Sequence, residues 1–496
     1  MLFDKITPES AGISSSQVKK YLAGLEKQGM PMHSVLMMKG DSLFCECYFA
    51  PYNKDSLNRM YSQTKSFVSM AIGLLIDDGK LRLDDKIVSF FQDKINTPLP
   101  KYLEEQTIRD MLTMCTVGGC PEWFGSDSPD RAYHYFNAKR YSIRPSGTEW
   151  DYDSAGSQVL SILVERLTGK RLFDFLYERL FSRLGTFNTA KILSARGGDS
   201  WGDSALLCTS RDMLSFARLL MNLGSWGGEQ LISKKYVKEA ISKQVSNRSS
   251  IKQTAFYDGY GYQIWRTKQN GFAFVGMGNQ LTVCLPEHDL IFTCTADCQG
   301  DDGIGREYII NSFFELIVNE ISSESLAQND EEYNALDEHL KTRKLFSVKG
   351  IEPPALQQKI NGITYECAPN RMEISSFRLE FADTYRGILH YTNAQGDKAL
   401  PFGINYNEFG KFPQLGYSTH TGGVRSTDGS MYNDAVSGAW LDEQRLLICV
   451  QIIDEYLGNL AILFSFKGDE VSVKMEKCAE DFLNEYYGTM IAKMKK

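Results

Sequence analysis

The sequence predicts an α+β domain followed by a C-terminal all-β domain. Alternating, strand-like segments stand near both ends of the first 321 residues, and the stretch between them has the spacing of helices. This order favours an antiparallel sheet flanked by helices, with a helical insertion between its two halves. After Val348, short alternating strands separated by Gly, Asn and Asp turns are typical of a meander or a small barrel.

The elements of the first domain are expected in the following order. A helix over Ser14–Gln28 begins at a serine-rich N-cap, and a hairpin over His33–Tyr48 turns at Gly40-Asp41. The helix over 63–79 ends at Gly79. Further helices are expected at Thr107–Met114, Ser154–Leu167, Leu172–Leu184 and Ser210–Leu223. The last elements are strands at Gly271–Val275, Leu281–Leu285 and Leu290–Ala296 and a helix at Gly305–Ile321.

A change of composition separates the two domains. The segment Ser322–Lys344 is polar and acidic and has few β-branched residues, as expected of a linker. We therefore predict one domain at 1–321, a linker at 322–347 and a second domain at 348–496. Strands of the second domain are expected at Met372–Phe381, Arg445–Ile453 and Glu470–Met475.

Composition and charge exclude several classes of protein. The 496 residues include 54 Lys and Arg against 62 Asp and Glu, a net charge of −8. Because an acidic chain repels nucleic-acid phosphates and anionic lipid, we expect neither as a partner. No run approaches the ~20 apolar residues that span a bilayer, and no basic segment precedes an apolar one at the N-terminus. Together with 11 cysteines in no framework spacing, this predicts a cytoplasmic protein.

The most informative motif is Ser62-x-x-Lys65, at the entrance to the helix over 63–79. Residues three apart share one face of a helix, with Cβ atoms ~5–6 Å apart. A serine hydroxyl becomes a nucleophile when a neighbouring base takes its proton, and burial makes a lysine lose its charge more readily. The pair therefore predicts nucleophilic catalysis.

This spacing alone is common. It recurs in two polar stretches, at Ser16/Lys19 and at Ser249/Lys252. There a helix N-cap with a surface lysine is the better interpretation. The copy at Ser62 differs because apolar residues follow it from Phe67 to Ile76 and would bury the helix.

The second motif is Tyr152-Asp-Ser154, just before the long apolar helix that starts at Ser154. A phenol close to a lysine can accept a proton and return it, as general base and then general acid. Taken alone, these residues favour a core tyrosine followed by a serine N-cap.

The third motif, Gly276-Met-Gly-Asn-Gln280, follows the strand over 271–275. A glycine in a strand often marks close approach of another group to the backbone. A backbone N–H at this strand could join that of Ser62 in an oxyanion hole. The alternative is a β-bulge.

In this order, the three motifs resemble the active-site triplet of the serine β-lactamase and penicillin-binding-protein superfamily, in its class C β-lactamase-like branch. Connecting blocks are similar as well, at Gly79–Asp85, Thr107–Met114, Leu167–Gly169, Leu184-Gly185, Thr209–Asp212 and Tyr260–Tyr262. The resemblance covers roughly residues 5–320. It implies a β-lactamase/transpeptidase-like fold, with a lipocalin-like barrel as the C-terminal domain.

Carried over by motif, the resemblance implies that Ser62 is the acylated nucleophile and that Lys65 and Tyr152 share the acid–base work. Which of these two is the base stays open, since coupled groups titrate as a pair. Ser154 would face the acyl portion of the substrate, although it replaces the amide that is usual in the family. The resemblance implies no cofactor.

The third strand departs from the family pattern. Where many relatives carry a cation and a hydroxyl, this chain has Phe274 and Val275 before Gly276. Gly276 and Met277 would contact the substrate, with the N–H of Met277 as second oxyanion donor; a shifted register gives that role to Asn279. Without a cation to hold a carboxylate, an uncharged ester or amide is favoured.

Two other patterns do not carry the chemistry. The segment Gly198-Asp-Ser200-Trp-Gly202 fits a nucleophile elbow, but no apolar strand precedes it and no helix follows, so a glycine-rich turn is predicted. The six histidines show no metal-binding pairing, so no metal site is expected.

The sequence thus predicts a metal-independent serine hydrolase that acts on a small-molecule ester, amide, peptide or β-lactam. The alternative is a penicillin-binding-protein-like binding or sensor protein, or a D-amino-acid peptidase with little β-lactam turnover. For the C-terminal domain, two roles stay open. It restricts the substrate pocket, as barrel appendages do in relatives, or it serves packing and a homo-oligomer contact.

Overall fold

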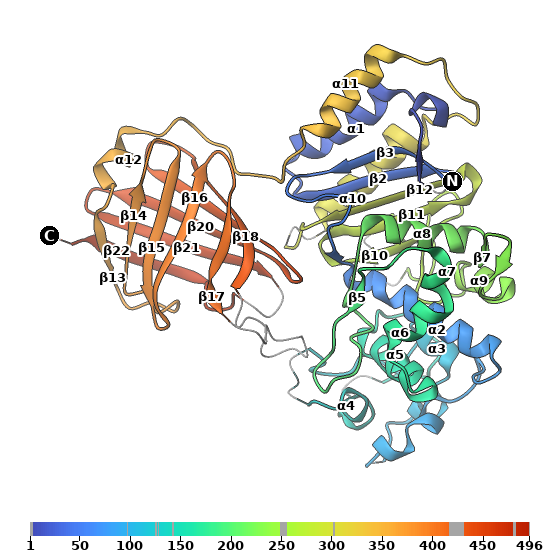
Figure 1. The fold of residues 1–496 in the computed structure, drawn as a ribbon. Coiled ribbons are helices and arrows are strands. Elements are labelled where there is room, and N and C mark those ends of the chain that lie inside the picture. The colour runs from blue at the N-terminus through green and yellow to red at the C-terminus, as the bar shows by residue number, and fades with distance from the viewer. Residues whose placement is uncertain are drawn as a thin grey trace. The chain divides into compact units, whose positions relative to one another are not determined.

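The computed structural model describes residues 3–96, 98–124, 126, 128–140, 143–248, 255–300, 303–415, 431–479 and 483–495. These residues form two compact units, and the chain passes from the first to the second between Lys344 and Leu345. The first unit has the α+β fold and the second the all-β fold, as predicted (Figure 1). The domain boundaries drawn from composition, at 321 and 348, stay predictions.

The first unit is built on a seven-stranded sheet with the order β1-β3-β2-β12-β11-β10-β9. Its strands are β1 Asp4–Lys5, β2 Met32–Lys39, β3 Ser42–Tyr48, β9 Trp265–Thr267, β10 Gly271–Gly276, β11 Gln280–Leu285 and β12 Leu290–Ala296. Antiparallel pairing of Ile291 with Met38 joins the early hairpin to the late strands. Neighbouring strands run antiparallel, apart from β1 beside β3, which confirms the predicted sheet.

Helices cover both faces of this sheet. On one face lie α1 (Ser15–Lys27) and α10 (Ile304–Phe313), and on the other lie α2 (Thr64–Asp77), α5 (Ser154–Thr168) and α8 (Ser210–Met221). Side chains of successive strand residues point to opposite faces. Leu36 therefore enters the core around α2, while Met37 enters the core around α1.

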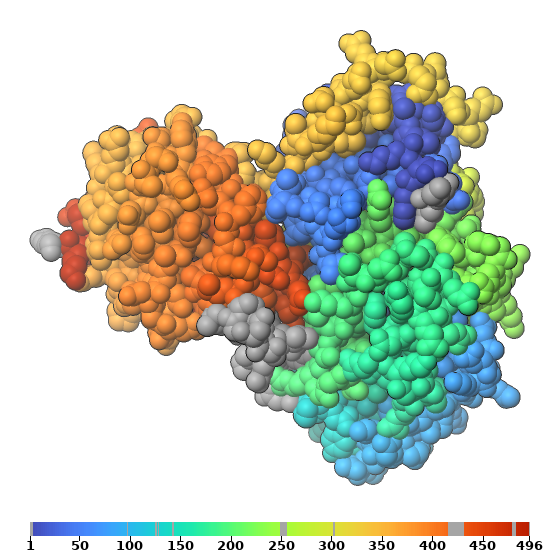
Figure 2. Space-filling view, in the orientation of Figure 1, coloured from blue at the N-terminus to red at the C-terminus, as the bar shows by residue number. Residues whose placement is uncertain are grey.

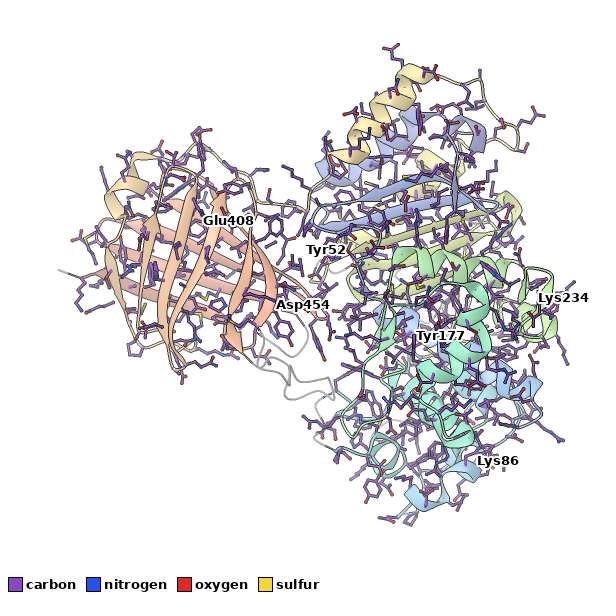
Figure 3. The ribbon with its side chains drawn as sticks, in the orientation of Figure 1. Tyr52, Lys86, Tyr177, Lys234, Glu408 and Asp454 are labelled. Atoms are coloured by element: carbon purple, nitrogen blue, oxygen red, sulfur yellow. The ribbon has the colours of Figure 1, made fainter. Side chains whose placement is uncertain are left out.

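Two long helices of the sequence prediction are interrupted in the structure. The segment predicted as one helix over Leu172–Leu184 consists of α6 (Leu172–Leu176), a π-helical turn and α7 (Ser182–Leu184). Tyr177, labelled in Figure 3, begins that turn. The last predicted helix of the domain likewise ends as α10 plus a π-helical turn at Phe314–Val318. Apolar spacing continues through both turns, so the spacing gives no sign of the change in hydrogen bonding.

The remaining elements of the first unit are short. They are β4 Asn58–Arg59, α3 Ile108–Leu112, α4 Arg131–Asn137, β5 Lys191–Ile192, β6 Leu206–Cys208, β7 Ser225–Trp226, β8 Glu229–Gln230 and α9 Lys234–Ala240. Within the described ranges, no helix is both long enough and apolar enough to cross a membrane.

Part of the predicted linker is helical. Asn329 caps α11 (Asp330–Lys341), and the three acidic residues of its first turn suit the positive end of the helix dipole. α11 packs along α1 and buries Leu336, as Figures 1 and 2 show for the two segments. The acidic composition taken as a sign of a linker thus belongs in part to a helix start.

Among its described residues, the second unit is a sheet of ten strands, nine of which close into a barrel. Its strands are β13 Thr364–Cys367, β14 Ser376–Phe381, β15 Arg386–Asn393, β16 Gly396–Ile404, β17 Glu408–Leu415, β18 Met431–Trp440, β19 Arg445–Ile453, β20 Leu457–Lys467, β21 Glu470–Ala479 and β22 Gly488–Met494. Parallel pairing of Gly403 with Ser437 closes the wall, and β17 pairs beside β18. A short helix, α12 (Ala355–Ile360), precedes the strands. The predicted barrel is confirmed.

Candidate active site

A strained turn presents Ser62 at the start of α2. A 3₁₀ turn over Tyr61–Gln63 leads directly into the helix, and Tyr61 has a φ of 46°. Positive φ is unusual for a bulky residue and persists only where neighbours hold it. Here the Thr64 hydroxyl donates to the carbonyl of Tyr61 at 2.6 Å, and Leu206 accepts from the Met60 N–H at 2.8 Å. Ser62 stays partly exposed at this turn.

Lys65 lies one helical turn further on, under Ser62. Its side chain is buried, and Nζ donates to Ser62 Oγ at 2.9 Å and to the carbonyl oxygen of Asp203 at 2.6 Å. Burial of α2 explains this, because 12 of its 14 residues, Lys65 among them, are buried. The structure thus brings the serine and the lysine of the first motif into hydrogen-bond contact.

Tyr152 comes to the same place from the start of α5. The centroid of its ring lies 5.1 Å from Lys65 Nζ. The ring stacks on Trp265 at 5.7 Å between centroids, with 23° between planes. Its hydroxyl makes no hydrogen bond to another described residue. The tyrosine ring is therefore beside the lysine, while its hydroxyl is unengaged within the described part of the chain.

Aromatic side chains surround Tyr152, and the sequence analysis did not assign them to the site. Trp150, Tyr260 and Trp265 contact one another, with ring centroids 5.2–5.7 Å apart. Trp150 stands two residues before the second motif, and Tyr260 stands in a connecting block, so both lie in or next to family-like segments. Trp265 begins β9, and only the pairing of β9 with β10 brings it to the site.

Ser154 is the first residue of α5. Asp153 caps the helix: its carboxylate accepts from the Gly156 N–H at 3.0 Å and from the Thr116 hydroxyl at 2.9 Å. Burial raises the pKa of Asp153, and these two hydrogen bonds oppose that effect. Ser154 is half-buried, and among the described residues it has no hydrogen bond to Ser62 or Tyr152. The cap is thus the aspartate and not the serine.

Gly276 ends β10 against the backbone that leads to Ser62. A Cβ at this position would lie 2.3 Å from the carbonyl oxygen of Met60, so any side chain would force the two segments apart. Met277, which follows, is 38% exposed. Gln280 stabilises the turn by donating from Nε2 to the carbonyl of Met277 at 3.1 Å, and Asn279 is buried. The third motif therefore lies beside the first.

Asp203 is a neighbour of Lys65 that the sequence analysis did not identify. Besides its backbone contact, one carboxylate oxygen lies 4.0 Å from Nζ. Ser200, three residues earlier, is buried in an irregular turn, as expected of a segment that only imitates a nucleophile elbow. Nothing in the glycine-rich sequence around Asp203 has a spacing that would signal a site.

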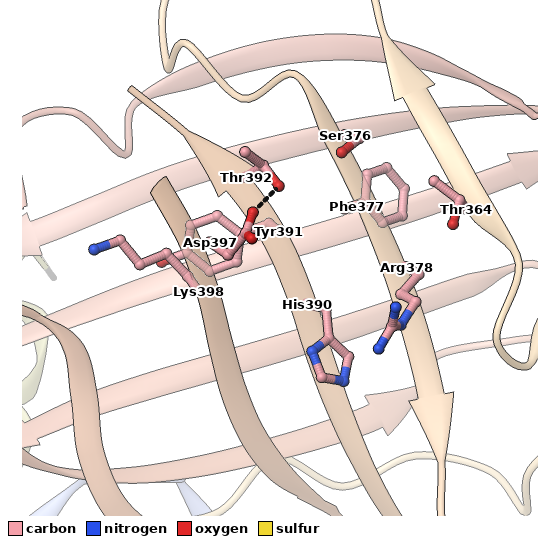
Figure 4. Close-up of a pocket in the computed structure, with 9 residues that line it drawn as sticks. All are labelled: Thr364, Ser376, Phe377, Arg378, His390, Tyr391, Thr392, Asp397 and Lys398. Atoms are coloured by element: carbon pink, nitrogen blue, oxygen red, sulfur yellow. Dashed lines mark hydrogen bonds between the residues drawn. The ribbon is translucent and has the colours of Figure 1, made fainter. Parts of the chain in front are cut away.

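A separate pocket of about 240 Å³ lies on the wall of the second unit (Figure 4). Its polar side chains pair with their neighbours: Thr392 donates to Asp397 at 2.7 Å, and Arg378 and His390 both contact Glu380. Among the described residues, no cluster of three His, Cys, Asp or Glu residues could hold a metal ion. The first unit therefore has the better candidate site.

Comparison with known proteins gives a family match for most of the first unit. Residues 18–311 match the family described as Beta-lactamase. The curated 6-aminohexanoate-dimer hydrolase of Paenarthrobacter ureafaciens is 24% identical over 263 residues. That match covers 49% of this chain and 66% of the relative, slightly less than two thirds of its length.

Solved structures share the fold of the first unit. A β-lactamase/D-alanine carboxypeptidase from Yersinia pestis has a TM-score of 0.51 at 15% identity, and the match covers 62% of this chain and 98% of that one. EstCE1, a hydrolase with promiscuous acyltransferase activity, has a TM-score of 0.51 at 13% identity, over 60% of this chain and 99% of its own. At these identities the likeness concerns the fold alone.

Proposed function

The chain belongs to the Beta-lactamase family, and from that premise we propose that it is a metal-independent serine hydrolase with an acyl-enzyme intermediate on Ser62. One observation carries the proposal: Lys65 Nζ lies 2.9 Å from Ser62 Oγ in a buried setting. At this distance the hydroxyl proton can pass to an amine as the oxygen attacks a carbonyl carbon.

Acylation would proceed through a tetrahedral intermediate. Ser62 Oγ bonds to the carbonyl carbon, and its proton passes to Lys65 or to Tyr152. The same pair then returns a proton to the leaving group. Water repeats these steps on the acyl-enzyme, releases the acid and restores Ser62. The share of Tyr152 rests on the second motif and on the closeness of its ring, 5.1 Å from Nζ; its hydroxyl would have to reach the transferred proton once substrate is bound.

Two backbone N–H groups, those of Ser62 and Met277, would stabilise the oxyanion. Such donors are each worth about 10²–10³-fold in kcat. The close approach of Gly276 to the carbonyl of Met60 supports Met277 as the second donor. Met277 directly follows Gly276, and Met60 lies two residues before Ser62. Donation by Asn279 is the alternative.

We propose an uncharged ester or amide as the substrate class. Phe274 and Val275 occupy the strand positions from which a cation would hold a carboxylate, and both are buried. The aromatic group formed by Trp150, Tyr260 and Trp265 adds apolar surface beside Tyr152. The name of the curated relative, a hydrolase of the 6-aminohexanoate dimer, supports an amide bond.

Pre-steady-state kinetics tests the proposal. Mixing the protein with a p-nitrophenyl ester should release a burst of nitrophenol equal to the enzyme concentration, and Ser62→Ala should abolish it. Ser16→Ala, at the exposed copy of the spacing, is the matched control and should keep the burst. A burst that persists in Ser62→Ala would end the proposal.

Intact mass after incubation with nitrocefin or a D-amino-acid anilide separates the substrate classes. A long-lived adduct on Ser62 without turnover would identify a sensor or binding protein instead. Turnover of the esters, with neither an adduct nor turnover from the other probes, is the expected result.

A further inference from the structure

A carboxylate is buried beside the candidate catalytic lysine. Asp203 is 1% exposed, and among the described residues its carboxylate oxygens make no hydrogen bond of full geometry, although the Trp201 side chain acts on it as a donor. One oxygen lies 4.0 Å from Lys65 Nζ. Burial of a carboxylate in its charged form is strongly unfavourable unless a nearby positive charge offsets it.

Three cations face this carboxylate from different elements. They are Lys65 on α2, Arg59 on β4 and Arg131 on α4, and the indole of Trp201 also lies beside it. Burial raises the pKa of Asp203, and the three cations act in the opposite direction.

The two arginines are engaged elsewhere. Arg59 lies between the rings of Tyr61 and Trp201, 4.6 and 4.5 Å from their centroids, and donates to the carbonyl of Ser204. Arg131 stacks on an indole ring and donates to backbone carbonyls. Of the three cations, Lys65 has the largest effect on Asp203, and its Nζ lies 4.0 Å from the carboxylate.

We propose that Asp203 is a positioning residue that holds Lys65 against Ser62 with its backbone carbonyl and sets the protonation of that lysine with its carboxylate. The proposal rests on the proposed function. It assigns to one residue two separate effects, a hydrogen bond at 2.6 Å that fixes where Nζ lies and a charge at 4.0 Å that fixes its proton.

Asp203→Asn separates the two effects, because it keeps the backbone carbonyl and removes only the charge. Loss of the negative charge disfavours the ammonium form of Lys65. If neutral Lys65 is the base, the acidic limb of the pH profile of kcat/KM moves to lower pH. If the ammonium instead supports a Tyr152 phenolate, the alkaline limb moves to lower pH. Either shift, expected at about one pH unit or more, supports the proposal and also identifies the base.

Asp212→Asn is the matched control. Asp212 is also a buried carboxylate of the first unit, but it accepts from the N–H groups of Phe187 and Thr209 at 2.6 and 2.8 Å and caps α8. Its loss should lower the melting temperature and leave both limbs of the profile in place. A purely structural role of Asp203 would give the same result.

A double-mutant cycle tests the pairing without reference to activity. Asp203→Asn should lower the melting temperature by leaving Lys65 uncompensated, and adding Lys65→Met should recover stability. If Asp203→Asn alone does not fold, the double variant should still fold. Additive effects in the cycle, or an unmoved pH profile in a folded Asp203→Asn protein, would overturn the proposal. A nitrophenol burst that survives Ser62→Ala would sink the proposed function but leave the cycle interpretable.

Discussion

The two units bury polar side chains in different ways. The first unit buries the charged groups Lys65 and Asp203 within 4.0 Å of each other. Inside the barrel, the buried polar contacts are mostly between neutral groups: Tyr391 and Tyr486 share a hydrogen bond of 2.8 Å between their hydroxyls. Asp434 is an exception there, and burial raises its pKa to about 7.

This difference shows what burial alone does to an acid. Asp434 has no cation in ion-pair contact among the described residues, and near neutrality it binds a proton. Burial raises the pKa of Asp203 as well, but three cations facing it, Lys65, Arg131 and Arg59, act against that rise. A charged pair kept in a protein interior is seldom the most stable solution, and it is typical of sites that transfer protons. The comparison therefore agrees with the proposed site in the first unit.

The largest effect is expected from Lys65→Met. Removing the amine leaves Ser62 without its hydrogen-bonded neighbour, so kcat/KM for an activated ester should fall by about 10³-fold. Lys411→Met on the barrel is the control and should change kcat/KM by less than about twofold. Comparable losses of kcat/KM in both variants would contradict the assignment of catalysis to the first unit.

A smaller effect is expected from Gly276→Ala. The added methyl group would meet the carbonyl of Met60, and a backbone shift of this kind costs about 1–3 kcal/mol of stability. Because the shift separates β10 from the turn of Ser62, kcat should fall about tenfold or more. Gly410→Ala in the barrel adds its methyl group 3.2 Å from the Asp434 side chain and should leave kcat unchanged. An active Gly276→Ala enzyme would show that the close approach is dispensable.

The smallest effect on activity, none at all, is expected from Asp434→Asn. The folded protein holds a proton at this site up to a pKa of about 7, whereas the unfolded chain releases it near pH 4. The free energy of unfolding therefore falls as the pH rises between these values, by about 2.5 kcal/mol from pH 5 to pH 8. Hydrogen exchange of β18 peptides in the full chain should show this loss, and Asp434→Asn should remove it. A pH-independent wild type would contradict the expectation.

Local patterns explain what the sequence could predict. Alternation of apolar and polar residues predicted the strands on both sides of the insertion. The three-residue spacing placed Lys65 under Ser62 because the 3₁₀ turn that carries Ser62 runs directly into α2. Asp203 could not be found in this way, since it is 138 residues from Lys65 and stands in a turn without periodicity. Trp265 reaches the site only through strand pairing. α11 was missed because an acidic first turn and an acidic linker have similar composition.

The burial of 12 of the 14 residues of α2 has a consequence for how such a protein can diversify. These residues are closely packed, so Lys65 and the turn before it cannot be moved without disturbing the core. The aromatic side chains around Tyr152 come from the segment before α5, from a connecting block and from the start of β9. Under the proposed function, substrate preference can therefore evolve, or be engineered, at these positions while Ser62 and Lys65 stay in place.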